Sequence, residues 1–388
     1  MKCITVIGAG PAGLMCAEQL SKAGLTVTVY DRMPSPARKF LVAGRGGLNL
    51  THSEPFERFI ARYGKAAIRL RPALEGFTPA QLRAWADGLG AMTFTGSSGR
   101  IFPKAMKASP LLRAWLKRLD DQGVVFRLRH DWVGWDGDAV MFRHGDSVVS
   151  QQADAVVLAL GGASWPRLGG DGGWKTLLEA RGIAAKPFQP SNGGFICRWS
   201  DGFAARHAGT PLKNIALDLA GRNVRGELML TRTGIEGGAV YALSGALRDA
   251  VSRSGSAELT IDLRPDLSAG QVISKLGRAS PKDSLSNRLR KSLNLTPAAI
   301  ALVHETGATD IKAVPLTLTG AQGLDRAISS AGGIAFDEIS DSFELKRMPG
   351  VYAIGEMLDW EAPTGGYLLQ ACFSTAVAAA RTIIARSG

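Results

Sequence analysis

The sequence predicts an α/β fold in which a parallel sheet is interrupted by a long insertion and completed near the end of the chain. Residues 3–8 form an apolar strand pattern, residues 11–24 have the apolar spacing of a helix, and residues 26–31 form a second strand pattern. This strand–helix–strand order is typical of a parallel sheet. The chain has 388 residues and exceeds the roughly 250–300 residues at which a single core stops growing, so several domains are expected.

Further elements of the first domain follow this unit. Helices are predicted where a cap residue and a proline precede an apolar stripe, at Thr78-Pro79 and at Ser109-Pro110. The tract 33–53 is rich in proline and glycine and is predicted to be a loop. Strands are predicted at 124–129, within a hairpin region at 131–149, and at 153–162.

The composition changes after about residue 187. Short segments at 215–220, 226–231 and 258–263 alternate apolar and polar residues, which indicates an antiparallel sheet or barrel with one face in water. Residues 266–307 are instead helical and basic, with helix starts predicted at Ser280-Pro281 and Thr296-Pro297.

Strand patterns return near the end of the chain, at 311–319, 342–346 and 349–355, before a final helix over 367–387. We therefore predict a discontinuous nucleotide-binding domain, a β-rich domain inserted into it, and a small helical domain inserted in turn. Their boundaries are 1–187 with 345–388, 188–265 with 308–344, and 266–307.

Residues 8–13, GAGPAG, form a GxGxxG motif between the first strand and the first helix. Gly8 permits the tight turn, Gly10 lets a pyrophosphate approach the backbone, and Gly13 brings the helix against the strand. Asp31 ends the second strand, where a carboxylate accepts hydrogen bonds from ribose hydroxyls. The motif predicts dinucleotide binding without separating NAD from FAD.

The end of the chain favours FAD. Gly355 and Glu356 follow a strand, and residues 364–367, TGGY, stand directly before the last helix. This second helix N-terminus has bare backbone amides, which can donate to a ribitol chain or to the flavin O2 atom. No second GxGxxG motif follows a strand, so a dedicated NAD(P)H domain is not expected. The first domain is therefore predicted to be a Rossmann-like FAD-binding domain of the glutathione-reductase type.

Three side chains in glycine-rich loops are candidates for catalysis. Arg45 would stabilise an anionic reduced flavin, and His52 would move protons near neutral pH. For both residues, a solvated position in the loop is an equal alternative. Trp165 either stacks on the cofactor or packs in the core, and the sequence identifies no general acid or base.

The net charge is +12, but lysines and arginines are scattered, with no run of five or six basic residues. A solvated basic surface is therefore expected rather than a nucleic-acid interface. Cysteines and histidines lack metal-ligand spacing, so no metal site is predicted. Since no signal-peptide pattern and no apolar run of about 18 residues occur, a cytoplasmic protein without a membrane partner is expected.

The motifs together resemble the three-domain bacterial flavoproteins that include aminoacetone oxidase and the BaiN-like proteins. The resemblance covers essentially the whole chain and rests on 8–14, 38–52, 99–103, 160–172, 226–240, 331–334 and 350–371. It implies non-covalent FAD and a β-barrel-like substrate domain that carries a small helical domain. Leu368 replaces the asparagine usual in this family, and residues 44–49 also depart from its pattern, so the resemblance implies a divergent subgroup.

Motifs and resemblance together define one predicted cofactor site. Its residues are Gly8, Gly10, Pro11, Ala12, Gly13, Asp31, Arg32, Arg38, Lys39, Gly46, Gly47, Asn49, Val133, Gly161, Gly162, Gly355, Glu356, Gly365, Gly366, Tyr367, Leu368 and Leu369.

We expect an FAD-dependent oxidoreductase that transfers a hydride at flavin N5 to or from a small molecule. Its electron partner would be oxygen or another acceptor, or transient NAD(P)H as a donor. A second interpretation is an NAD(P)H-using reductase of an enone or ring substrate. A third is a flavoprotein that binds nucleic acid or a protein through 264–291, where seven Lys or Arg residues face only Asp266 and Asp283.

Overall fold

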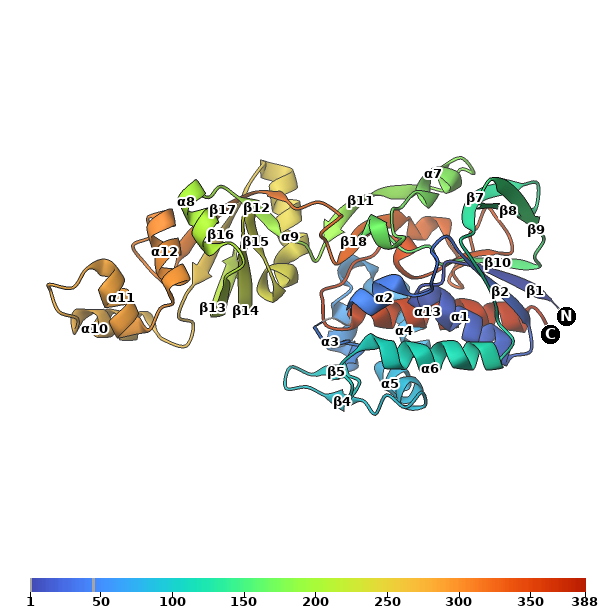
Figure 1. The fold of residues 1–388 in the computed structure, drawn as a ribbon, viewed down its shortest axis with the longest axis horizontal. Coiled ribbons are helices and arrows are strands. Elements are labelled where there is room, and N and C mark those ends of the chain that lie inside the picture. The colour runs from blue at the N-terminus through green and yellow to red at the C-terminus, as the bar shows by residue number, and fades with distance from the viewer. Residues whose placement is uncertain (1, 44–45) are drawn as a thin grey trace. The chain divides into compact units, whose positions relative to one another are not determined.

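A computed structural model describes residues 2–43 and 46–388 (Figure 1). The chain forms two compact units, residues 1–189 with 329–388 and residues 190–328. The predicted arrangement of a Rossmann-type domain that returns after an antiparallel insertion is confirmed.

A five-stranded parallel sheet forms the centre of unit 1, in the order β19-β10-β1-β2-β6. Its strands are β1 (Cys3–Ile7), β2 (Thr26–Asp31), β6 (Val125–Leu128), β10 (Ala155–Leu158) and β19 (Val351–Ala353). The predicted βαβ unit is therefore present. The strand from the C-terminal segment pairs with β10, so the end of the chain completes the sheet.

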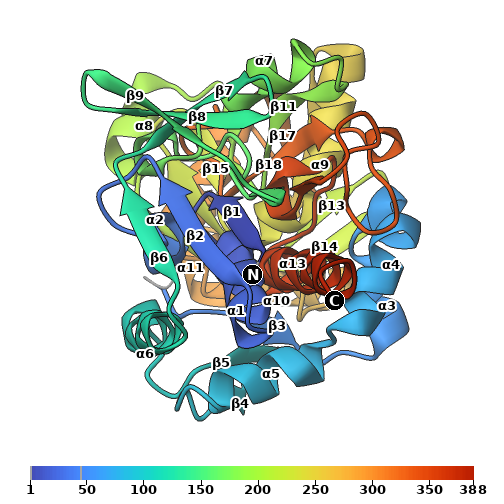
Figure 2. The same cartoon turned by 90° about the vertical axis from the view of Figure 1, so that its right-hand side faces the viewer.

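Two helices from opposite ends of the chain, α1 (Pro11–Lys22) and α13 (Tyr367–Ala385), lie side by side beneath this sheet (Figure 2). Their apolar faces bury residues such as Leu14 and Phe373. By length and composition α13 is apolar enough to cross a membrane. However, 61% of its most apolar 18-residue stretch is buried inside the protein.

The remaining elements of unit 1 surround this core. They are α2 (Arg38–Ala43), β3 (Thr51–His52), α3 (Phe56–Ala61), α4 (Ala67–Gly76), α5 (Pro79–Asp87), β4 (Phe94–Thr95), β5 (Arg100–Phe102), α6 (Ala108–Asp121), β7 (Asp131–Asp136), β8 (Ala139–His144), β9 (Ser147–Gln151), α7 (Trp174–Glu179), β11 (Ala185–Ser191) and β18 (Ser329–Ile334).

Four local expectations in unit 1 were incomplete or wrong. The tract 33–53 contains α2 rather than only loop, and the helices α3 and α4 were not predicted. Helix α6 begins at Ala108 instead of Pro110, because Lys107 takes the extended cap position. Residues 342–346 form isolated bridges at Glu344 and Leu345 rather than a strand.

Unit 2 is built around a closed antiparallel barrel in the order β12-β15-β14-β13-β16-β17. The strands are β12 (Phe195–Cys197), β13 (Pro211–Leu219), β14 (Arg222–Thr231), β15 (Gly234–Glu236), β16 (Ala257–Asp262) and β17 (Val314–Ala321). Alternate residues such as Leu217, Leu259 and Leu318 fill the barrel core, which confirms the β-barrel-like insertion. The barrel is accompanied by α8 (Asp201–His207) and α9 (Gly238–Ser254).

Three short helices follow the fifth barrel strand, α10 (Ala269–Gly277), α11 (Leu285–Leu293) and α12 (Pro297–Thr306). The cap at Thr296 and the end of α12 at Gly307 occur as predicted. The start of α11 was predicted wrongly, because Ser284 rather than Ser280 caps the helix. This start places Leu289 and Leu293 on the buried face.

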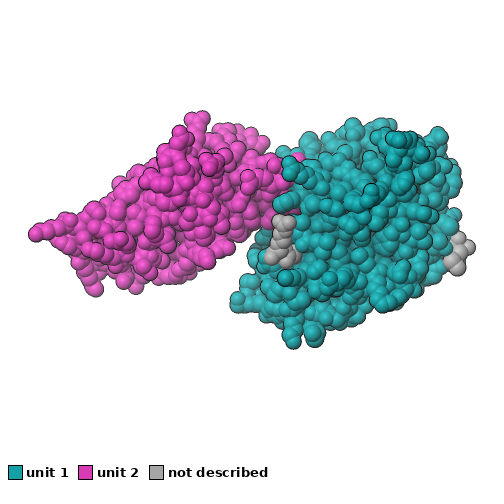
Figure 3. All heavy atoms as spheres, viewed as in Figure 1, with its two compact units in different colours: residues 1–189, 329–388 teal, residues 190–328 magenta. Residues whose placement is uncertain are grey.

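The boundaries of the two units differ from the predicted domain boundaries at residues 188–189, which group with unit 1, and in one longer segment (Figure 3). Residues 329–344 were placed with the β-rich domain, but they group with unit 1. The reason is local, since β18 forms a two-stranded sheet with β11. The helical segment 266–307 groups with the barrel in unit 2.

Candidate functional site

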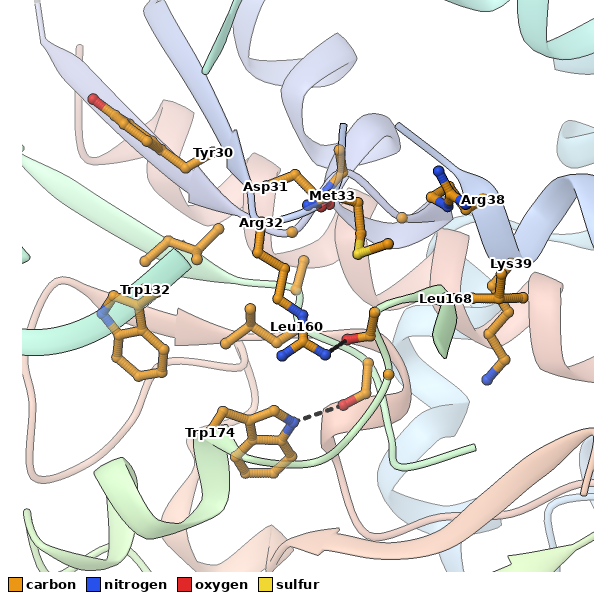
Figure 4. A pocket seen from close by; sticks show the side chains of 18 of the residues that line it. Tyr30, Asp31, Arg32, Met33, Arg38, Lys39, Trp132, Leu160, Leu168 and Trp174 are labelled. Atoms are coloured by element: carbon orange, nitrogen blue, oxygen red, sulfur yellow. Dashed lines mark hydrogen bonds between the residues drawn. The ribbon is translucent and has the colours of Figure 1, made fainter. Parts of the chain in front are cut away.

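A cavity of about 470 Å³ opens in unit 1 where β1, β2 and β10 end. Ligands of open α/β sheets bind at this carboxyl edge, and the volume lies in the usual range for small-molecule sites. In the view of Figure 4, Trp132 and Lys39 lie on opposite sides of the cavity with Arg32 between them. Predicted cofactor residues that line it are Gly8, Gly10, Pro11, Ala12, Asp31, Arg32, Arg38, Lys39, Val133, Gly161, Gly162 and Glu356.

The three motif glycines are required for different reasons. A Cβ atom on Gly8 would lie 2.3 Å from the Ala159 carbonyl oxygen, and one on Gly13 would lie 1.9 Å from the Gly8 oxygen. These two glycines therefore permit strand and helix to pack. A Cβ atom on Gly10 would meet no described atom within 4 Å. Gly10 borders the cavity, so its small size leaves room for a ligand rather than for the protein.

Helix α1 presents bare backbone amides to this cavity. Gly10 is its N-cap, no side chain of the described chain caps it, and no acidic residue occupies its first turn. Because the N-terminal end of a helix carries partial positive charge, this end favours an anionic group such as a pyrophosphate.

Asp31 holds the glycine loop in place from the end of β2. Its Oδ2 accepts a hydrogen bond from the Ala9 amide at 2.7 Å, and its Oδ1 accepts one from the Met33 amide at 2.7 Å. Burial raises the pKa of Asp31 despite these two hydrogen bonds. Each carboxylate oxygen has a further lone pair available for a ribose hydroxyl.

Loop 160–174 forms a second wall of the cavity and is fixed by polar contacts. The Arg32 guanidinium donates to Asp171 Oδ2 and to the Gly169 carbonyl, both at 2.6 Å. Trp174 Nε1 donates to the Gly161 carbonyl at 2.8 Å. Burial would raise the pKa of Asp171, but the hydrogen bonds from Arg32 and the Gly173 amide, together with the Arg32 charge, outweigh it and lower the pKa.

Lys39 connects α2 to the end of the chain. Its Nζ lies 3.0 Å from Glu356 Oε2 and 2.6 Å from Ser164 Oγ. Next to it, Gly355 packs against α1, since a Cβ atom there would lie 2.9 Å from Ala12 Cβ. The predicted closure of the site by the C-terminal segment is therefore made by specific contacts.

The start of α13 packs against the segment around β3 in unit 1. A Cβ atom on Gly366 would lie 2.4 Å from Thr51 Cα, and its φ of +93° favours glycine. The Tyr367 side chain points into unit 1, where its hydroxyl donates to Glu54 and its ring stacks on His52. Its carbonyl accepts from Tyr63 Oη at 2.8 Å. The amides of the first turn remain uncapped by side chains of the described chain.

Two of the three catalytic candidates, His52 and Trp165, do not line the cavity. His52 has both ring nitrogens engaged: Nδ1 accepts from the Glu54 amide at 3.1 Å, and Nε2 lies 2.9 Å from the Ser98 carbonyl. With both nitrogens engaged by the backbone, the ring supports the loop. Trp165 lies within loop 160–174, where it adopts a left-handed backbone with φ of 59°. Arg45, like Gly44, lies outside the described residues.

Two buried polar atoms of predicted cofactor residues find no hydrogen-bond partner among the described residues: Arg38 Nε at the cavity and Asn49 Oδ1 outside its lining. Because buried polar groups are normally paired, these atoms point to a ligand. Arg38 lines the cavity and offers a donor suited to a phosphate or ribose oxygen. The space at Gly10, the bare α1 amides and these unpaired atoms fit an FAD molecule.

Several predicted cofactor residues lie outside the cavity lining: Gly13, Gly46, Gly47, Asn49, Gly355, Gly365, Gly366, Tyr367, Leu368 and Leu369. The sequence prediction missed other lining residues, including Tyr30, His130, Arg143, Asp171 and Trp174. Only the LGGDGGW run at 168–174 carried a signal for them, as a glycine-rich loop after a strand. His130 precedes the hairpin region 131–149 and Arg143 lies within it, and neither belongs to a motif.

The Rossmann sheet, its glycine loop and the cavity define a dinucleotide-binding enzyme of the flavoprotein class. The family described as HI0933-like protein Rossmann domain matches residues 2–382, and the chain belongs to this family. It is an FAD-dependent oxidoreductase.

Two characterised relatives are similar along nearly the whole chain. The ribosomal RNA dihydrouridine synthase of Haemophilus influenzae is 27% identical over 402 residues, which cover 97% of each chain. The 3-dehydro-bile acid delta(4,6)-reductase of Clostridium scindens is 26% identical over 420 residues, which cover 100% of each chain.

The structure of the 3-ketosteroid-delta4-(5alpha)-dehydrogenase of Rhodococcus jostii RHA1 is also similar. The TM-score is 0.55 with 13% identity, and the match covers 98% of this chain and 96% of that chain. At this identity the likeness shows a shared fold.

Proposed function

We propose that the chain is a reductase that adds two hydrogens to a carbon–carbon double bond conjugated to a carbonyl group, with uridine in RNA as the substrate. The observation that carries this proposal is the end-to-end similarity to a ribosomal RNA dihydrouridine synthase. Dihydrouridine is uridine with two hydrogens added across the C5–C6 bond, which is conjugated to the C4 carbonyl. A delta(4,6)-reductase of a 3-dehydro-bile acid acts on double bonds conjugated in the same way.

The residues of this chain have separate roles in that proposal. The α1 amides and Gly10 would hold the pyrophosphate, Asp31 would accept from the ribose, and Arg38 Nε would donate to an oxygen of the nucleotide half. When bound, FAD supplies the N5 atom that exchanges a hydride. The uncapped α13 amides at 367–369 would stabilise negative charge at the pyrimidine edge of the flavin.

External NAD(P)H is the proposed reductant. The sequence contains a single GxGxxG motif between a strand and a helix, so no second nucleotide domain is expected to hold it. It would therefore act as a diffusing reductant that leaves before the substrate is reduced.

The sequence-based expectation placed a small molecule before RNA as the substrate. Two observations now favour RNA: the relative named above and a net charge of +12, which attracts polyanions. A steroid-like enone remains the second candidate, favoured by the Clostridium scindens relative.

An anaerobic single-turnover experiment tests the function. The FAD-loaded protein is reduced with dithionite and mixed with ribosomal RNA, with a 3-oxo-4-ene steroid or with buffer, and flavin absorbance is followed. Return of the oxidised spectrum with RNA, together with dihydrouridine in the digested RNA, is the expected result. Oxidation by the steroid alone would assign the second candidate. Oxidation by neither compound, with rapid reoxidation by oxygen, would reject the reductase.

A parallel reduction experiment tests the reductant. Oxidised protein is mixed anaerobically with NADPH or with NADH, and bleaching of the flavin by either nucleotide is expected. Reduction by dithionite but by neither nucleotide would reject NAD(P)H and leave the substrate assignment unaffected.

A further inference from the structure

The helical part of unit 2 carries a concentrated positive charge. Two of its three helices, α10 and α11, lie side by side at one end of this unit, and α12 lies toward the barrel (Figure 1). Between residues 264 and 291 there are two acidic and seven basic residues. The basic residues are Arg264, Lys275, Arg278, Lys282, Arg288, Arg290 and Lys291.

Both acidic residues of this segment are already engaged. Asp283 pairs with Lys291 at 2.9 Å. Asp266 pairs with Arg225 at 3.0 Å and accepts from Asn214 at 2.5 Å. Neither carboxylate is therefore free to neutralise the other cations.

Five cations of the segment form no ion pair with any described residue: Lys275, Arg278, Lys282, Arg288 and Arg290. We call these five residues the insert cations. Arg264 differs from them, because its guanidinium donates to the Leu293 and Asn294 carbonyls at the end of α11. In unit 1, by contrast, Arg71 is shared by Glu57 and Glu75.

The insert cations are accessible, and apolar side chains lie among them. Four of the five are exposed, and Arg288 is half-buried. Arg288 Nε is buried and finds no hydrogen-bond partner in the described chain. Ile273 on α10 is 71% exposed and Leu285 on α11 is 48% exposed. Uncompensated cations beside exposed aliphatic groups present both charge and contact area to a partner.

We propose that α10, α11 and their connection bind the phosphate backbone of the RNA substrate. The identity of the polyanion rests on the proposed function, whereas the surface itself rests on the insert cations. Unpaired lysines and arginines bind phosphates and release counterions, which gives affinity without base specificity. Ile273 and Leu285 would pack against sugar and base faces. The surface therefore binds and orients RNA, and the flavin unit performs the chemistry.

RNA fits this surface better than an acidic protein does. Protein interfaces depend on buried aromatic or arginine anchors in pockets. Residues 264–291 contain no Trp, Tyr or Phe, and the insert cations lie on two short helices and their connection. Charge, rather than shape, is the property that this surface offers.

The experiment measures binding separately from reduction. A fluorescein-labelled RNA hairpin with uridines in its loop is titrated with FAD-loaded protein, and fluorescence anisotropy is recorded at several KCl concentrations. The test variant is Lys275→Gln, Arg278→Gln and Lys282→Gln, whose side chains are exposed and make no described hydrogen bond. The control is Lys22→Gln, Lys65→Gln and Arg113→Gln in unit 1, which removes the same charge from exposed positions.

The insert variant should bind RNA at least tenfold more weakly, and the control should stay within twofold of wild type. With about 0.7 counterions released per phosphate contact on a single strand, the slope of log affinity against log salt should fall by about two. Equal weakening by both variants would overturn the proposal, because net charge alone would then explain it. Wild-type protein that fails to bind RNA even at low salt would also overturn it.

The two proposals fail in different ways. If the protein binds RNA through the insert cations but does not reduce it, the proposed function is rejected and the proposed RNA-binding surface stands. If wild type and the insert variant reduce RNA with equal kcat/KM, the proposed RNA-binding surface is rejected and the proposed function stands. Flavin absorbance and thermal midpoint of every variant confirm that FAD and fold are retained.

Discussion

Two helices of unit 1, α1 and α13, each have a glycine as N-cap and no side-chain cap among the described residues, but the two glycines are required for different reasons. At Gly10 an added Cβ would enter open space at the cavity, whereas at Gly366 it would lie 2.4 Å from Thr51 Cα. We therefore expect the first glycine to be required by a ligand, whereas the second is required by the protein. Similar glycine motifs at the two ends of a sequence can thus be required for different physical reasons. Substitutions at Gly10 and Gly366 test these reasons one at a time.

Gly10→Val should have the largest effect, and it should act on the cofactor. The valine would occupy the space proposed for the pyrophosphate without meeting described atoms at Cβ. FAD affinity should fall at least about thousandfold, or about 4 kcal/mol. The flavin-to-protein absorbance ratio after gel filtration and the thermal midpoint of the apoprotein measure this.

A matched control is available for that change. Gly238→Val also adds a side chain in open space at the first residue of a helix, α9, but in unit 2. It should leave FAD affinity unchanged. Wild-type FAD retention by Gly10→Val would mean that the pyrophosphate lies elsewhere.

Gly366→Ala should act on the fold. The new methyl group would clash with the Thr51 backbone, and alanine would be strained at a φ of +93°. We expect the apoprotein to lose about 3 kcal/mol of unfolding free energy, from strain together with overpacking. Urea unfolding without FAD measures it. If Gly366→Ala lost FAD while its apoprotein kept wild-type stability, both glycines would be required by the ligand. That result would contradict the proposed difference between the two helix starts.

Asp31→Asn should have a smaller effect on the glycine loop at α1. The carboxylate accepts from two backbone amides, whereas an amide side chain offers one oxygen and leaves a buried amide unpaired. The cost should be about 2 kcal/mol of apoprotein stability. Hydrogen exchange at Ala9 and Met33 should quicken in the variant. Exchange at wild-type rates would show that Asp31 does not hold the loop.

Glu54→Gln should give the smallest effect, confined to the surroundings of α13 and dependent on pH. Burial raises the pKa of Glu54, but hydrogen bonds from Arg62 and Tyr367 outweigh it, and the net pKa is lowered below 4.5. The carboxylate therefore stabilises the fold above pH 4.5, and this contribution is lost as the pH falls through its lowered pKa.

The variant should be about 1 kcal/mol less stable than wild type at neutral pH. The difference should shrink toward zero in acid, as shown by urea midpoints at several pH values. FAD affinity should not change. A difference that stays constant with pH would contradict the role of the ionised carboxylate.

The sequence predicted those parts of the site that depend on local spacing. GAGPAG and Asp31 lie in one βαβ unit, so their arrangement follows from strand and helix geometry. The ion pairs that form the cavity walls join Arg32 to Asp171 and Lys39 to Glu356, 139 and 317 residues apart in sequence. No local pattern encodes such contacts, which depend on how loops return to the sheet.

The misplaced elements have the same cause. Ser280-Pro281 and Ser284 are both acceptable helix starts, and burial of Leu289 and Leu293 selects the second. His52 was a candidate for proton transfer because of its glycine-rich loop. Its packing against Tyr367 and its contact with the Ser98 carbonyl, both distant in sequence, give it a supporting role.

Hydrogen exchange of unit 1 with and without FAD tests the central claim most directly. One cofactor should span both helix starts, from the α1 amides at 11–14 to the α13 amides at 367–369. Adding FAD to the apoprotein should slow exchange at both segments and leave the α10 and α11 amides unaffected. Protection at α1 alone would place the flavin ring away from α13, and protection at neither would contradict the cofactor site itself.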